Sequence, residues 1–116
     1  MPAAKKLRTL SVEDVIDLDD LPSEVVPTPE WGEGTGVEVR ALSRMEVVRL
    51  VEACTDDETG SFDNAKYQLT LVMKGWGVTE DRYTQLERKH TTPIRRIADK
   101  VAELSGVSEN RFQLPD

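Results

Sequence analysis

Side chains that could bind a metal or act as a nucleophile are scarce in this chain. It holds one cysteine, Cys54, and one histidine, His90. A structural zinc site takes four ligands, and a disulfide needs two cysteines. His90 follows Lys89 in a charged stretch, so we expect a solvated loop residue. These residues predict no catalytic group, no metal site and no cofactor site, and hence a protein that is not an enzyme.

Two other stretches superficially resemble ligand-binding loops. Residues 55–63, TDDETGSFD, are acidic, but a calcium loop alternates its acids around a central glycine and closes with a glutamate. Residues 29–36, PEWGEGTG, hold three glycines but lack the lysine of a phosphate loop and the helix that follows a dinucleotide fingerprint. We interpret the first as a connection between helices and the second as a turn between strands.

Trp31 lies within the proline-rich stretch DLPSEVVPTPEWG, residues 20–32. An indole there could stack on a ligand, anchor a partner or pack at a turn. No second aromatic or catalytic side chain accompanies it in that stretch, which disfavours ligand stacking. We expect the ring to fold over the turn onto a helix that begins at Arg44, with partner contact as the main alternative.

The composition is that of one acidic domain. A chain of 116 residues with 38% hydrophobic, 5% aromatic and 32% charged residues predicts a modest aliphatic core. The net charge is -7, and residues 11–33 hold eight acids and no base. Such a chain gains nothing from counterion release on DNA, which disfavours nucleic-acid binding. With a lone cysteine, no apolar leader and no apolar run of about 20 residues, we expect an unsecreted protein without a membrane span.

The elements that would position these side chains follow from propensity and spacing. The short β-branched runs at 24–28 (EVVPT) and 37–41 (VEVRA) predict a hairpin, with Pro27 at a sheet edge. Expected helix starts are a capping box of Ser43 and Glu46 and the N-caps Asp63, Thr79 and Thr92, the last followed by Pro93.

The predicted fold class is therefore α+β, mainly α: an N-terminal two-stranded β-hairpin at about 24–41 packed on a bundle of three to four short helices. The helices are expected at about 44–54, 64–76, 80–89 and 93–105. Around them we expect a disordered N-terminal arm at 1–10, a single compact domain at 11–106 and a flexible C-terminal tail at 107–116.

Apolar spacing predicts which face of each helix is buried. One or two helical turns after Ser11 would be held only by docking. Gly75 and Gly77 should end the helix at 64–76. The expected buried faces are Val47, Val48, Leu50, Val51 and Cys54, then Ala65, Leu69, Val72, Met73 and Trp76, and last Ile94, Ile97, Ala98, Val101 and Leu104.

The order of features resembles the tail assembly chaperones of long-tailed, siphovirus-type bacteriophages. The resemblance covers about residues 10–106, and its specific part is DLPSEVVPTPEWGEGTGVEVRALS, residues 20–43: a D-L-P-x-E step, a V-P-x-W-G-like hairpin and a V-x-V-R-x-L strand before a capped helix. The turn is longer than the compact form of the family, and Trp76 is an additional tryptophan.

The resemblance implies a role in virion assembly. Such proteins are non-virion helpers in the host cell cytoplasm that bind the tape-measure protein, keep its hydrophobic helices soluble and help recruit subunits of the major tail protein to the tube. A longer form made by ribosomal frameshifting is also implied. No catalytic residue transfers. We expect partner binding in hydrophobic grooves between helices, through Trp31, Val48, Val51, Leu69, Met73 and Trp76.

Two other functions remain open. A structural tail or head-completion protein would stay in the virion. A small DNA-binding regulator would use residues 79–106 as a helix-turn-helix, although acids there nearly cancel the bases Arg88, Lys89, Arg95, Arg96 and Lys100. An edge strand and exposed apolar stripes would also permit self-association.

Overall fold

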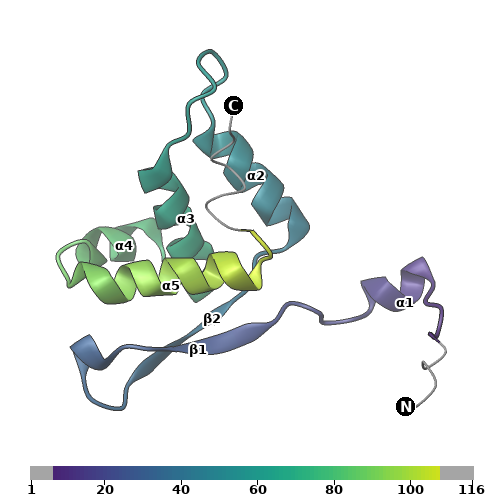
Figure 1. The fold of residues 1–116 in the computed structure, drawn as a ribbon, viewed down its shortest axis with the longest axis horizontal. Helices are drawn as coiled ribbons and strands as arrows, with labels where there is room; N and C mark the ends of the chain where they lie inside the picture. The colour runs from purple at the N-terminus through teal and green to yellow at the C-terminus, as the bar shows by residue number, and fades with distance from the viewer. Residues whose placement is uncertain (1–6, 108–116) are drawn as a thin grey trace, which may run out of the picture.

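The computed structural model describes residues 7–107 as a small sheet with helices packed on one face (Figure 1). The elements in chain order are α1 (Val12–Ile16), β1 (Ser23–Pro27), the 3-10 turn η1 (Pro29–Trp31), β2 (Gly36–Arg40), α2 (Arg44–Cys54), α3 (Asn64–Trp76), α4 (Glu80–Leu86) and α5 (Thr91–Leu104). The predicted α+β, mainly helical class is confirmed. The predictions for residues 1–6 and 108–116 lie outside the described residues.

The hairpin is an antiparallel pair whose register runs from Ser23 opposite Arg40 to Pro27 opposite Gly36. Val26 and Val39 are each 1% exposed, whereas Val25 is 59% exposed. Alternation of side chains along a strand therefore gives the sheet one buried and one solvated face. Helices α3 and α5 contact the strands and form the core with them.

The start of α2 agrees with its predicted capping box. Ser43 N–H donates to Glu46 Oε1 at 2.9 Å, and Glu46 N–H donates to Ser43 Oγ at 3.3 Å. Arg40 adds a two-pronged contact to the same carboxylate, with both N···O distances at 3.0 Å. This pair joins the end of β2 to the first turn of α2 and fixes the angle between them.

The buried face of α3 differs from the predicted one. The buried residues are Tyr67, Leu71, Val72 and Gly75. Of the expected set, Ala65 is exposed, and Leu69, Met73 and Trp76 are only half-buried. Gly75 was expected to end the helix, but it lies inside it. The helix ends at Gly77, which takes the left-handed conformation at φ 83° and donates its N–H to Met73 O.

The boundaries of the last two helices differ from the predicted ones. Helix α4 ends at Leu86 rather than near residue 89. Helix α5 begins at Thr91, because the N-cap is His90 rather than Thr92, and His90 Nδ1 accepts the Thr92 N–H at 3.2 Å. His90 is thus an exposed cap and not a free loop residue. The predicted stripe of α5 is otherwise confirmed, with Leu104 half-buried.

Helix α1 forms but does not dock. Ser11 and Asp14 make a reciprocal capping box at 3.1 Å in both directions. No residue of α1 is buried, and Figure 1 shows it at the end of an extended segment, away from the other helices. The docking expected to hold this helix is therefore absent from the described residues.

Candidate partner-binding site

The two tryptophans of the chain stack on each other. The ring centroids of Trp31 and Trp76 lie 6.3 Å apart with an interplanar angle of 19°. Trp31 follows β1 and Trp76 is the last residue of α3. The prediction that Trp31 packs on the helix beginning at Arg44 is therefore wrong: its aromatic partner comes from α3. Both indoles are half-buried and pack against the hydrophobic core.

A threonine pair shapes the turn that presents Trp31. Thr28, 1% exposed, has its hydroxyl 2.8 Å from that of Thr35. Thr35 Oγ1 also lies 2.7 Å from both Thr28 O and Gly32 O. Thr28 O in turn accepts the Trp31 N–H at 2.9 Å. These short local bonds hold a turn that is longer than a tight hairpin, so the indole has a defined direction.

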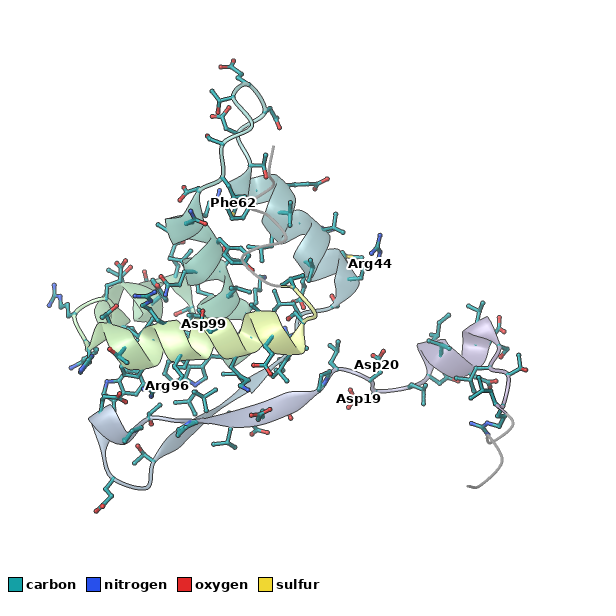
Figure 2. All side chains as sticks on the ribbon, in the orientation of Figure 1. Asp19, Asp20, Arg44, Phe62, Arg96 and Asp99 are labelled. Atoms are coloured by element: carbon teal, nitrogen blue, oxygen red, sulfur yellow. The ribbon has the colours of Figure 1, made fainter. Side chains whose placement is uncertain are left out.

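Arg96 clamps this turn onto α5 (Figure 2). Its guanidinium donates to Pro27 O at 2.8 Å and to both carboxylate oxygens of Glu30, at 3.0 and 2.8 Å. Hydrogen bonding to Arg96 lowers the pKa of Glu30 to about 2. A planar guanidinium that binds a carboxylate with two bonds fixes orientation as well as distance. The residue before Trp31 is therefore tied to the helix opposite.

Glycines set the position of Trp76. A Cβ at Gly75 would overlap the side chain of Val101, so the glycine permits α3 and α5 to approach closely. Gly77 then ends α3 in the left-handed conformation, where both its own N–H and that of Val78 bond to Met73 O at 2.9 Å. This is a helix end of the Schellman type. It turns the chain directly after the indole, and Thr79 then caps the start of α4.

An open depression lies beside Trp76, and we call it the Trp groove. Its volume is about 440 Å³, and it is lined by Trp76, Gly77, Val78, Thr79, Arg82, Gln85, Leu86 and Lys89. The residues at 82, 85, 86 and 89 share one face of α4 and the turn after it. Its apolar side chains are half-buried and its two cations are exposed. Within residues 7–107, neither Arg82 nor Lys89 forms an ion pair with a carboxylate, and Arg82 donates to Gln85 Oε1 at 3.5 Å.

Most of the Trp groove was not predicted from the sequence. Val78, Arg82 and Lys89 are not in the predicted set of partner-binding residues. The spacing of Arg82, Leu86 and Lys89 on one helical face is visible in the sequence. Its closeness to Trp76 is not, because it depends on the turn angle at Gly77.

The remaining predicted residues do not join the tryptophans in one surface. Val48 was expected on the buried face of α2, but it is 41% exposed, and only Leu50 and Cys54 of that helix are buried. Val48 borders a separate depression with Leu42, Val47 and Val107. Val51, on the same helix, is half-buried. Leu69 and Met73 pack against the core from α3. Figure 1 shows α2 and α4 on opposite sides of α3, so the six residues belong to at least two surfaces.

Other chemically capable residues have structural surroundings. Burial raises the pKa of the Cys54 thiol, which keeps it protonated near neutrality. Asp56 accepts the backbone N–H groups of Glu58 and Thr59 at 2.8 and 3.0 Å, as in a simple turn. Between residues 7 and 107 no three histidine, cysteine or acidic side chains come together as a metal site. No helix in that range is long and apolar enough to cross a bilayer.

The bases of α5 are largely paired with acids. Arg96 binds Glu30, and Lys100 Nζ lies 3.2 Å from Glu24 and 3.1 Å from Glu103. The contacts with Glu30 and Glu24 join α5 to the hairpin, whereas the contact with Glu103 lies within α5. They also reduce the positive charge that a helix-turn-helix would present to phosphates.

Comparisons with protein-family models, curated proteins and solved structures give no match to this chain. The geometry of the candidate site and the resemblance of residues 20–43 are therefore the two features that point to a function.

Proposed function

We propose that this protein is a bacteriophage tail assembly chaperone, which binds the tape-measure protein and helps tail-tube assembly in the host cytoplasm without entering the mature virion. The resemblance described above supplies the family. The observation that carries the binding role is the Trp groove, with an apolar floor of Trp76, Val78 and Leu86 between two exposed cations.

The groove suits an amphipathic helix. Such a ligand lays its apolar side chains in a hydrophobic groove, and its acidic flanks meet basic side chains at the rim. A large indole can supply much of the contact area, since aromatic side chains bury more surface than any others. The net charge of -7 would keep a complex with hydrophobic client helices in solution.

Co-expression tests the proposal. The chain is produced with and without the tape-measure protein encoded in the same genome, and the soluble fraction and co-elution of the client are measured. The proposal predicts a large gain in soluble client that travels with the chain through size exclusion. No gain and no co-elution would contradict it.

Mass spectrometry of purified virions separates the chaperone from a structural protein. The chaperone role predicts that peptides of this chain are abundant in infected cells and nearly absent from particles. Stoichiometric peptides in the particles would instead favour a tail or head-completion protein.

A further inference from the structure

Residues 10–21 form an acidic amphipathic arm without a partner surface in the described part of the chain. Val12, Val15 and Ile16 recur at helical spacing and are 69%, 47% and 71% exposed. Glu13 and Asp17 lie along one side of this stripe, and the arm holds five acids and no base. The arm means this segment, residues 10–21, and not the stretch at 1–10.

The arm has the features of a docking element. A five-residue helix has little intrinsic stability in water, because isolated helices need about 12–15 residues. Its capping box compensates at one end only. Large apolar side chains that are exposed together on one face indicate an interaction surface rather than scattered surface residues.

The Trp groove is complementary to the arm. Its apolar lining matches the aliphatic stripe, and Arg82 and Lys89 match the acids beside that stripe. No carboxylate lines the groove. Opposite charges flanking matched apolar surfaces direct both association and orientation.

Chain geometry disfavours docking of the arm on its own groove. The arm joins the body at Pro22, whose carbonyl accepts the Ala41 N–H at 2.8 Å at the open end of the hairpin. Trp31 lies beyond the other end of β1, and five residues of strand span about 16 Å. The connection at 17–21, which includes Asp19 and Asp20 (Figure 2), gives six Cα–Cα steps between Ile16 and Pro22 and reaches at most about 22 Å. Most of that length is used along β1 alone, before the chain passes Trp31.

We infer that the arm of one copy docks in the Trp groove of a second copy of this chain. The stripe of Val12, Val15 and Ile16 contacts Trp76 and Leu86, and Glu13 and Asp17 face Arg82 and Lys89. Self-association requires no client and does not rest on the proposed function. The arm of a second copy and a client helix would occupy the same Trp groove. The two would therefore compete, and two copies would associate only when no client is bound.

Sedimentation equilibrium with two complementary variants tests this inference. In the first variant, Val12→Asp/Ile16→Asp, the arm is impaired and the groove is intact. In the second, Arg82→Glu/Lys89→Glu, the groove charge is reversed and the arm is intact. All four residues are exposed, so both variants should fold, which circular dichroism checks. We expect the wild type to associate with concentration and each variant alone to associate at least ~10-fold more weakly.

The mixture is decisive. Equal amounts of the two variants should form a one-to-one complex, since one supplies the arm and the other the groove. Adding Glu13→Lys/Asp17→Lys to the reversed groove should restore self-association. A monomeric wild type at about millimolar concentration would overturn the inference, as would unchanged association of the arm variant, which would indicate another interface. An arm protected from proteolysis in a monomer would show docking within one chain and would also overturn it.

Discussion

The stacked rings of Trp31 and Trp76 tie the hairpin turn to the end of α3, and each ring limits how far the other can move. The position of the Trp31 ring is set by local hydrogen bonds between Thr28 and Thr35, and that of the Trp76 ring by the glycines on either side of it. A ring held in this way can contact a partner without first losing much conformational freedom. Under the proposed function, Trp76 would therefore contribute to both packing and partner binding.

Replacing Trp31 tests its packing role. Trp31→Ala should lower the free energy of unfolding by about 2 kcal/mol, since a half-buried indole loses roughly half of what a core tryptophan contributes. Trp31→Phe should retain most of the stability. Chemical denaturation measures both. Full stability of Trp31→Ala together with lost client binding would show that the residue acts mainly as a partner contact.

The carboxylates of Glu30 and Glu46 should make the stability of the fold depend on pH. Hydrogen bonding to arginine lowers the pKa of Glu30 and of Glu46 to about 2, from an ordinary value of 4.5. A carboxylate with a lowered pKa in the folded state stabilises above its unfolded pKa, and this contribution is lost as it becomes protonated. Stability should therefore fall as the pH drops from about 4.5 to about 2, as denaturation at a series of pH values will show.

A substitution at Arg96 separates the two carboxylates. Arg96→Gln should return the pKa of Glu30 toward 4.5 in a carboxyl NMR titration and leave that of Glu46 near 2. Arg95→Gln, at the exposed neighbouring position, is the matched control and should change neither. A Glu30 that still titrates near 2 without Arg96 would refute the clamp.

Among the elements, three of the four predicted helix caps were correct, because a cap depends on a few adjacent residues. The exception is α5, whose cap is His90 rather than Thr92. Ser43, Asp63 and Thr79 each accept a backbone N–H three residues later, as expected. The buried face of α3 was not predictable in the same way. Tyr67 and Gly75 belong to that face, but a tyrosine has a polar end and a glycine has no side chain, so apolar spacing alone passes over both.

The contact between α3 and α5 gives a prediction for one glycine. In Gly75→Ala the overlap of the added methyl with Val101 should cost up to about 3 kcal/mol. After the gain of about 1 kcal/mol in helix propensity, we expect a net loss of stability of up to about 2 kcal/mol. Thermal denaturation of Gly75→Ala and of Gly75→Ala/Val101→Ala measures the effect, since the second substitution removes the overlap. A more stable Gly75→Ala would show that the helices are not in close contact there.

At the scale of the whole molecule, an acidic arm and a groove with basic edges lie at opposite ends of the hairpin. The sequence shows the acidic run at 11–33 and indicates one small domain. It does not show that the arm stands free or that the groove forms, because both depend on contacts between distant segments. Most of the elements, but only part of the candidate site, were therefore predictable.

A fluorescence titration measures client binding at the Trp groove. A soluble tape-measure fragment without tryptophan is added to the protein, whose only two tryptophans are the stacked pair. Leu86→Gln alters the groove, and Met45→Gln, at a position on α2 that is 61% exposed, is the control. We predict changed emission on binding, unchanged affinity for Met45→Gln and about 10-fold weaker binding for Leu86→Gln. No binding by the wild type, or equal affinity for wild type and Leu86→Gln, would show that the client does not bind in the Trp groove.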